Sequence, residues 1–345
     1  MAVTVKSAKE IELMREAGRR LEIVHDEMAK IIRPGISTME INEKGDKVIR
    51  ELGCKPNFLH YGGFPASICV SVNEEVVHGI PKRDRILKEG DIVSLDAGLI
   101  YKGYHSDAAR THAVGQISPE AQKLLDVTKQ SFFEGIKQAK AGNHLFDISA
   151  AIDDYVSGFG YGIVQDLVGH GIGTELHEDP QIPNFRQKRR GIILVPGMTL
   201  AIEPMVNMGT WKVRWLDDEW TVISEDHSLA AHSENTILIT DGEPEILTLQ
   251  HASGNYYMVR TETGMLVRSL AGHEKDRLYI IIRQDEEYVW LVDGRNRTME
   301  KPKKKKKKHI QVIHRIPEPV KKMLESGETL SDEMIIQAIQ SDSKN

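Results

Sequence analysis

The sequence has few cysteines and no long apolar run. Its 345 residues include only Cys54 and Cys69, too few for a disulfide framework or a cluster of cysteine metal ligands, and consistent with a reducing compartment. Charged residues interrupt the amino terminus, and no stretch approaches the roughly 18 apolar residues that a membrane span needs. We therefore predict a cytoplasmic protein with no secretion signal and no membrane partner.

Charge is divided unevenly along the chain. From residue 251 onward there are 18 Lys and Arg against 14 Asp and Glu, a net charge of +4, and the part before it has 27 against 37, a net charge of -10. An acidic globular part suits a site rich in carboxylates, whereas a basic appendix suggests a polyanionic partner. Polar residues after Leu249 indicate a linker over 250–263 between two domains.

Hydrophobic spacing predicts the secondary structure of the first 249 residues. Helical periodicity covers Ser7–Ile32, Ser37–Leu52, Pro119–Ala141 and Phe146–Phe159. Residues rich in β-formers fill the segments between the two helical pairs and after them. The order of helices, strands, helices and strands is typical of an α+β domain.

The stretch Ile92–His112 predicts a β-hairpin. Lys102-Gly103 offers a tight reversal between two runs of strand-forming residues. In that register Asp96 and Asp107 share one face as diagonal neighbours, about 7–8 Å apart at most. Carboxylates this close repel unless one is protonated or a cation lies between them. Taken alone, the pair is also compatible with two solvated aspartates on an exposed hairpin.

A weak internal repeat extends this pattern. The segments Gly90–Asp96 and Gly197–Glu203 each place an acid six residues after a glycine, at the end of an apolar strand. A further strand with another acid follows each of them, carrying Asp107 in the first half and Glu234 in the second. A short match of this kind also arises by chance. If it is real, a pseudo-twofold fold brings two acids from each half to a common centre.

A histidine among glycines supplies a softer candidate ligand. Glycines on both sides of His170 allow close backbone approach, and imidazole is a frequent ligand of transition metals. A single histidine is more often packed or solvated. Four carboxylates with one imidazole suit Mn(II), Fe(II), Co(II) or Zn(II), and paired ions are a known device of hydrolases.

In order and spacing, these residues resemble the motif set of the type I methionine aminopeptidases. The resemblance covers Val3 to Leu249 and includes Asp96, Asp107, His170, Glu203, Glu234, His78 and His177. It implies the pita-bread fold of the creatinase and aminopeptidase superfamily, with pseudo-twofold symmetry. It also implies an enzyme that removes the initiator methionine of nascent polypeptides whose second residue is small. Two divalent ions, of Co, Mn, Fe, Zn or Ni, would be its cofactors.

The resemblance also implies a role for each metal ligand. Asp107 and Glu234 would bridge the two ions, Asp96 would hold one ion, and His170 with Glu203 would hold the other. Water activated between the ions would attack the carbonyl carbon of the first peptide bond. Glu203 would relay the proton toward the leaving amine.

Substrate contacts are implied in the same way. His177 would help to stabilise the oxyanion, and His78 would hydrogen-bond near the scissile amide. The pocket for methionine would consist of Phe58, Tyr61, Phe64, Cys69, Leu176 and Trp220. These six are alternatively ordinary core residues. Leu176 departs from the family, in which this place is often aromatic.

The carboxy-terminal part resembles a KOW-motif domain over residues 264–316. Gly264–His273 and the predicted strands Leu278–Ile282 and Tyr288–Val292 carry the resemblance, with Asp276 where the family usually has glycine. It implies a small SH3-like β-barrel with a Lys-rich loop that contacts RNA. The expected phosphate contacts are Lys301, Lys303, Lys304, Lys305, Lys306, Lys307 and Lys308. The run is alternatively a solvated, disordered loop or a nuclear localisation signal.

The remaining predictions concern the tail and the partners. Residues 317–345 show helical spacing at Leu330, Met334, Ile335 and Ile339, which predicts a short amphipathic helix in a loose tail. We expect a monomer that meets nascent polypeptide amino termini and, through its appendix, the ribosome and its rRNA. The alternative is an inactive, ribosome-associated RNA-binding protein with the aminopeptidase fold, against which the intact ligand set argues.

Overall fold

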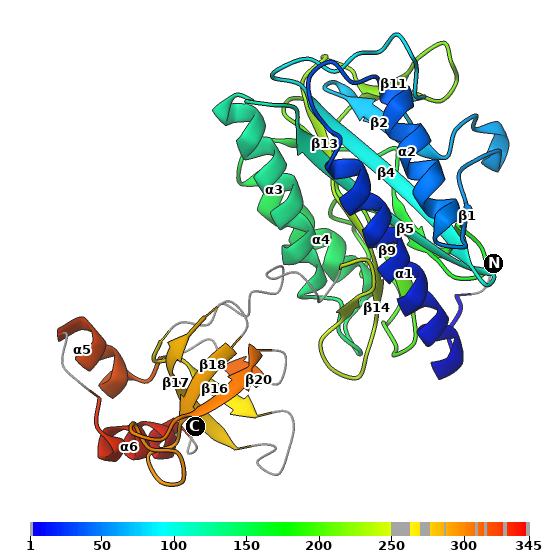
Figure 1. Ribbon diagram of the computed structural model, residues 1–345. Coiled ribbons are helices and arrows are strands. Elements are labelled where there is room, and N and C mark those ends of the chain that lie inside the picture. The colour runs from blue at the N-terminus through cyan, green and yellow to red at the C-terminus, as the bar shows by residue number, and fades with distance from the viewer. Residues whose placement is uncertain are drawn as a thin grey trace. The chain divides into compact units, whose positions relative to one another are not determined.

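The computed structural model describes residues 3–249, 263–269, 277–285, 288–307, 310–313, 316–326 and 330–342. The chain divides into two compact units, Met1–Gln250 and His251–Asn345 (Figure 1). None of the helices in these ranges combines the length and the apolar character needed to cross a membrane.

Four α-helices form among residues 3–249, at the places that the periodicity predicts. They are α1 (Ala8–Ala29), α2 (Thr38–Glu51), α3 (Pro119–Ile136) and α4 (Leu145–Ser157). Ser37 and Glu40 form a reciprocal capping box at the start of α2, and the Ser118 side chain accepts a hydrogen bond from the backbone N–H of Ala121 in α3. The third helix ends earlier than predicted, because the chain turns from Lys137 toward Gly142, which has a φ of 89°.

A nine-stranded sheet forms the centre of this unit. Its main path runs β1-β4-β5-β14-β9-β7-β8, with β2 paired to β4 and β15 paired to β14. Their bounds are β1 (Lys55–Pro56), β2 (Ile68–Val72), β4 (Ile92–Tyr101), β5 (Tyr104–Ala113), β7 (Gly169–Gly171), β8 (Glu178–Ile182), β9 (Thr199–Ile202), β14 (Glu234–Leu238) and β15 (Glu245–Ile246). The unit also contains two three-stranded sheets. One consists of β6 (Gly162–Ile163), β10 (Met205–Asn207) and β13 (Ala230–His232). The other consists of β3 (Glu75–Val77), β11 (Val213–Trp215) and β12 (Val222–Ser224).

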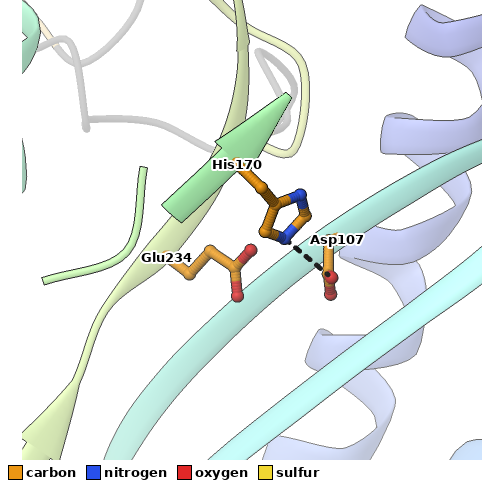
Figure 2. A group of neighbouring side chains, drawn as sticks. All are labelled: Asp107, His170 and Glu234. Atoms are coloured by element: carbon orange, nitrogen blue, oxygen red, sulfur yellow. Dashed lines mark ion pairs between the residues drawn. The ribbon is translucent and has the colours of Figure 1, made fainter. Parts of the chain in front are cut away.

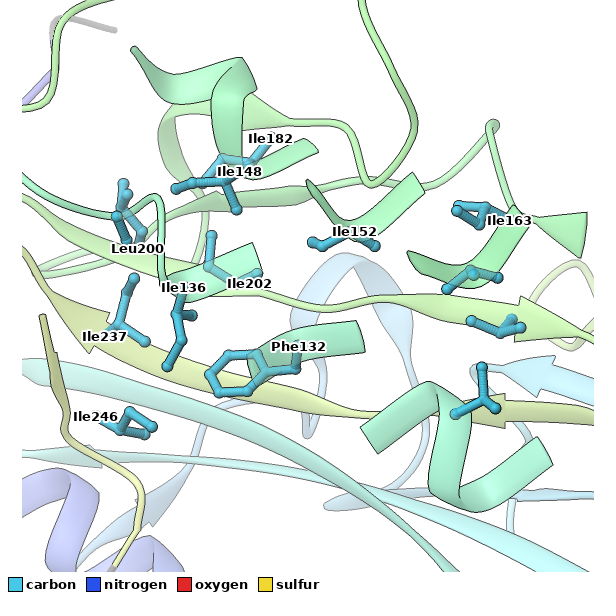
Figure 3. Close-up of a cluster of buried hydrophobic side chains, with 14 of the residues drawn as sticks. Phe132, Ile136, Ile148, Ile152, Ile163, Ile182, Leu200, Ile202, Ile237 and Ile246 are labelled. Atoms are coloured by element: carbon cyan, nitrogen blue, oxygen red, sulfur yellow. The ribbon is translucent and has the colours of Figure 1, made fainter. Parts of the chain in front are cut away.

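The helices cover one face of the sheet in two pairs (Figure 1). The first pair buries its apolar side chains against β2 and β4, and the second pair against β9 and β14. Figure 3 shows this second cluster, in which Phe132 of α3 and Ile148 of α4 lie with Ile202 and Ile237 of the sheet. Since side chains alternate along a strand, residues between these core positions point to the opposite face. That face carries the candidate site.

The internal repeat that the sequence suggests is visible in the backbone. Gly90 and Gly197 both have positive φ, of 91° and 93°, which favours glycine. The N–H of Gly90 donates to the carbonyl oxygen of Val114 over 3.0 Å, and that of Gly197 donates to Ile239 over 2.9 Å. The same turn therefore leads into β4 in one half and β9 in the other, as pseudo-twofold symmetry requires.

One contact of α1 allows a stability prediction. A Cβ at Gly18 would overlap the backbone carbonyl oxygen of Leu247, whereas one at Gly45 in α2 would meet only the side chains of Met28 and Ile68. Backbone moves less readily than a side chain, so we expect Gly18→Ala to lower the free energy of unfolding by about 2 kcal/mol. Gly45→Ala is the matched control and should lower it less. Urea unfolding of both variants measures the difference, and equal losses would contradict this account.

The second unit contains an antiparallel sheet of five strands in the order β19-β18-β17-β16-β20. The strands are β16 (Leu266–Ser269), β17 (Leu278–Gln284), β18 (Tyr288–Val292), β19 (Lys303–Lys306) and β20 (Ile310–Ile313). In the part of the chain that the structure describes, no pairing joins β19 to β20, so the SH3-like barrel stays a prediction. Buried apolar clusters lie on both faces of this sheet.

Two predictions for this unit are wrong. Lys303–Lys306 form the edge strand β19 rather than a loop, because each residue finds a partner on β18, and lysines are common on exposed sheet edges. The described part of the tail is not loose either, although the helix predicted around Met334 and Ile339 is present. This part forms two helices, α5 (Glu318–Ser326) and α6 (Asp332–Asp342), whose side chains Val320 and Ile335 are fully buried against the sheet. Burial of this kind depends on tertiary contacts that a local pattern does not contain.

Candidate metal centre

The predicted hairpin is confirmed and positions the first two carboxylates. Strands β4 and β5 pair in register, with a reversal at Lys102 and Gly103, whose φ values of 47° and 87° suit a two-residue turn. Asp96 lies opposite Ala109, and Asp107 lies two residues further along the same face. Leu95 and Ala97 on either side of Asp96 belong to the core beneath the helices, so the aspartates point away from it.

The second half of the sheet brings the other three residues to the same face. Glu234 of β14 pairs with Ala109 of β5, which places it in the row that contains Asp96. Glu203 directly follows β9, and His170 of β7 pairs with Ala201 of β9, two residues before Glu203. Register therefore gathers all five predicted ligands, although they come from strands far apart in the sequence.

The side chains approach one another closely (Figure 2). Nε2 of His170 lies 4.0 Å from Oδ2 of Asp107 and 3.6 Å from Oε1 of Glu203. The Nδ1–H of His170 donates to the carbonyl oxygen of Gly171 over 2.8 Å, so Nε2 carries the lone pair and faces the carboxylates. This tautomer is the one that can bind a metal ion from the carboxylate side.

Burial controls the protonation of these groups. It raises the pKa of Asp96 to about 7. Burial first, and neighbouring carboxylates second, raise the pKa values of Asp107 and Glu234 well above the ordinary range for acids. Burial also lowers the pKa of His170 to about 3. Without a cation, the acids thus tend to hold protons at neutral pH while the imidazole is neutral.

The donor set fits divalent cations. Within the described residues, buried oxygens of Asp96, Asp107 and Glu234 have no hydrogen-bond partner, and buried oxygens normally have one. Two groups have ligand atoms that all lie within 4.8 Å of one another, namely Asp107, His170 and Glu234, and Glu203, His232 and Glu234. Carboxylate oxygens with imidazole nitrogen are the ligands of Mn, Fe, Co and Zn sites.

A cavity of about 190 Å³ opens beside these ligands. Every residue predicted for the methionine pocket lines it, as do both predicted substrate histidines: Phe58, Tyr61, Phe64, Cys69, Leu176, Trp220, His78 and His177. The Tyr61 hydroxyl is 2.7 Å from Nδ1 of His177, and the Trp220 ring lies edge-on to Phe64 at 5.2 Å. The wall therefore combines apolar and aromatic side chains with the carboxylates and imidazoles of the cluster.

Sequence reasoning missed several residues of this site. Val77, Leu167, Val168 and Met205 add apolar wall, and His232 adds an imidazole beside Glu203 and Glu234. The sequence held only a partial signal for His232, which lies two residues before Glu234, because alternation places two such residues on one face only within a single strand and these two belong to β13 and β14.

The predicted RNA-contacting lysines do not share one environment. Lys305 is buried, and its ammonium donates to the Ser269 hydroxyl over 2.5 Å. Lys304 lies on the other face, with Nζ 4.0 Å from the centre of the Tyr288 ring. Lys306 lies on the same face as Lys304. The side chains of Lys303 and Lys307 are partly buried, and that of Lys301 is exposed. Lys308 lies outside the described residues.

Comparison with known proteins agrees with this geometry. The family model "Metallopeptidase family M24" matches residues 12–241. The chain is 53% identical over 247 residues to a methionine aminopeptidase of Clostridium acetobutylicum, covering 72% of this chain and 99% of that protein. It is 49% identical to methionine aminopeptidase 1 of Bacillus subtilis over 71% of this chain and 99% of the relative.

Solved structures show the same relationship. The crystal structure of methionine aminopeptidase from Thermotoga maritima superposes with a TM-score of 0.71 at 44% identity, over 72% of this chain and all 100% of that one. The pita-bread fold is therefore present, and the cofactors are divalent metal ions. The chain belongs to metallopeptidase family M24, among the methionine aminopeptidases, and it is a metal-dependent aminopeptidase.

Proposed function

We propose that this enzyme removes the amino-terminal methionine from polypeptides whose second residue is small. The observation that carries the proposal is that the carboxylate and imidazole cluster lines the same cavity of about 190 Å³ as a set of aromatic side chains. An unbranched thioether side chain packs well against aromatic rings of this kind. The names of the relatives support the same substrate class.

We propose the division of the ligands that the resemblance to the methionine aminopeptidases implies, and the shared face of these residues supports it. Asp107 and Glu234 would hold both ions, Asp96 would hold one, and His170 with Glu203 would hold the other. Divalent ions supply a water of lowered pKa and polarise the carbonyl of the scissile bond. Carboxylates and a neutral imidazole hold such ions without leaving uncompensated charge in a buried site.

Three further roles belong to side chains of the chain itself. Glu203 lies at the end of β9 beside the cavity, so it would receive the proton of the attacking water and pass it to the leaving amine. His177, held by the Tyr61 hydroxyl, would donate to the developing oxyanion. His78 would bond near the scissile amide. Burial lowers the pKa of His78 to about 4, so it is neutral and can both donate and accept.

Hydrolysis of short peptides tests the proposal. The enzyme loaded with Mn(II) or Co(II) should release methionine from Met-Ala-Ser, and much more slowly from Met-Leu-Ser, because a large second residue does not fit a crowded site. Leu-Ala-Ser controls for the first side chain. Absence of turnover with either metal at every concentration would contradict the proposal and would favour an inactive protein with this fold.

One surface of the second unit favours a second function, and we propose that it contacts RNA of the ribosome. Register places Arg283, Tyr288, Trp290, Lys304 and Lys306 on one face of β17, β18 and β19. The Arg283 guanidinium lies 3.8 Å from the centre of the Trp290 ring, and Lys304 lies 5.0 Å from it. Partly exposed aromatic rings between cations can stack on unpaired bases while the cations neutralise phosphates.

Two substitutions separate these contributions. Trp290→Ala should weaken binding of single-stranded RNA about tenfold and leave its salt dependence unchanged, because stacking contributes about 1–3 kcal/mol per base without releasing counterions. Lys304→Ala should reduce the slope of log K against log salt by about one. Lys321→Ala, an exposed lysine of α5, is the control. Fluorescence anisotropy across salt concentrations measures both.

Co-sedimentation with ribosomes tests the tether itself. The full chain should bind in a salt-dependent way, whereas a chain that ends at Leu249 should not. Equal binding by the two would exclude a tether in the second unit.

A further inference from the structure

His232 is buried in the wall of the cavity and faces two of the proposed metal ligands. It ends strand β13, and only 2% of its surface is exposed. Its Nε2 lies 3.8 Å from Oε2 of Glu203 and 4.0 Å from Oε2 of Glu234. These distances resemble the 3.6 and 4.0 Å that separate Nε2 of His170 from its own carboxylate neighbours.

The ring of His232 has no hydrogen-bond partner within the described residues, at either nitrogen. Other buried histidines do have one: Nε2 of His25 bonds to the carbonyl oxygen of Ala108, and Nδ1 of His170 bonds to that of Gly171. A buried polar atom without a partner is unfavourable, so the ring needs one that a protein side chain does not supply. Two carboxylates beside Nε2 make a cation the fitting partner.

We infer that His232 is a sixth protein ligand of the metal centre, binding through Nε2 the ion that Glu203 and Glu234 also hold. The inference deepens the proposed function and rests on its metal centre. Ligand atoms bound at about 2.0–2.2 Å to one ion lie roughly 3–4 Å from one another, which matches the separations around His232 with little movement. The four carboxylates and His170 then keep the roles already proposed for them.

A second imidazole changes the metal preference of the centre. A ligand set that includes both His170 and His232 is softer than one with a single imidazole. Imidazole favours Fe(II), Co(II), Ni(II) and Zn(II), whereas Mn(II) favours oxygen ligands. The structure therefore points to a stronger preference for Co(II) and Zn(II) over Mn(II) than His170 alone would give.

His232→Gln tests the ligand role with readouts other than activity. Loss of a direct ligand should raise the Kd of Co(II), measured by calorimetry, by at least the roughly 10–100-fold seen when a supporting residue is lost. The Kd of Mn(II) should change less. The visible spectrum of the Co(II)-loaded protein should also shift. Unchanged Co(II) affinity together with an unchanged spectrum would overturn the inference.

His112→Gln is the matched control. His112 lies on β5, and Nε2 of its ring also lacks a partner within the described residues. It is on the opposite face from Asp107, because the two residues are an odd number of positions apart along the same strand. This variant should keep the Co(II) affinity and spectrum of the parent, which separates loss of a ligand from loss of a buried histidine.

A measurement on the unaltered protein covers the case in which His232→Gln fails to fold. Proton NMR of the Co(II)-loaded parent should show strongly shifted, exchangeable N–H signals from two ligating imidazoles, and a single such signal would overturn the inference. The proposed function fails separately: a parent that binds Co(II) through two imidazoles yet does not cleave Met-Ala-Ser would contradict the function and leave the ligand assignment standing.

Discussion

Asp107→Ala should lower kcat/KM for Met-Ala-Ser by more than about 100-fold, because even residues that merely support a ligand contribute roughly 10–100-fold to metal affinity or activity. Oδ2 of Asp107 lies 4.0 Å from Nε2 of His170, and Asp107 shares a face of the hairpin with Asp96. A residue in that position can hold both ions. Its loss should therefore reduce metal content toward one ion or none per chain.

Asp96→Ala is the informative comparison. Asp96 belongs to neither of the two close groups of ligand atoms found among the described residues, so its loss should mainly weaken one ion. Excess metal should then restore more activity to Asp96→Ala than to Asp107→Ala. Asp84→Ala, at an exposed aspartate, controls for the change of charge. Metal analysis and kinetics that show equal, negligible effects of both substitutions would refute the assignment of Asp107 as the bridge.

The hairpin could be predicted because its information is local. A two-residue turn fixes the register of β4 and β5, and register then fixes which side chains share a face with Asp96. The repeat around Gly90 and Gly197 extended the argument to Glu203 and Glu234. The meeting of the two halves needed more, since pairing of β5 with β14 joins residues more than a hundred positions apart.

His232 shows where local reasoning ends. Residues 230–232 pair with β10 in one sheet, and Glu234 begins β14 in another, with Ser233 between them. A simple alternation assumes one continuous strand and does not reveal this change of sheet. The imidazole reaches the carboxylates because of how two sheets meet, which only the fold shows.

The prediction of a loop at the lysine run was wrong for a different reason. It was based on the composition of the run and did not consider the strand with which the run pairs. Uninterrupted charge suggested a solvated loop, yet Lys304 and Lys306 lie over Tyr288 and Trp290 of the neighbouring strand. Long alkyl stems pack on aromatic rings while their ammonium groups stay near water. A charged strand can therefore be stable at a sheet edge when its neighbour supplies such rings.

The buried acids also make the stability of the metal-free enzyme depend on pH in an unusual direction. A carboxyl with a raised pKa in the folded state binds more protons there than in the unfolded chain, so stability falls as pH rises above the ordinary value of about 4 toward the folded pKa. Asp96, with a pKa of about 7, and Glu203 and Glu234, with pKa values raised well above the ordinary range, act in this way.

Buried histidines change the stability of the metal-free enzyme in the opposite direction, and they do so over a lower range of pH. Burial lowers the pKa of His170 and His232 to about 3 and that of His78 to about 4. These histidines are still half protonated in the unfolded chain at about pH 6.5, so their contribution to stability rises with pH until about one unit above that value. Above about pH 7.5 they are neutral in both states and contribute little further change. Between about pH 7.5 and 8.5 the raised carboxyls therefore dominate the slope.

We therefore expect the free energy of unfolding of the metal-free enzyme to fall from about pH 7.5 to 8.5, by up to about 1.4 kcal/mol per pH unit for each proton involved. Bound metal should abolish this fall, because the cation keeps the carboxylates ionised in the folded state, and should add about 2.7 kcal/mol at a hundred times its Kd. Urea unfolding with a chelator and with Co(II) measures both effects.

Glu234→Gln removes one carboxyl whose pKa is raised, so the stability of its metal-free form should depend less steeply on pH. A metal-free stability that rises over this range would mean that the acids are already ionised without metal.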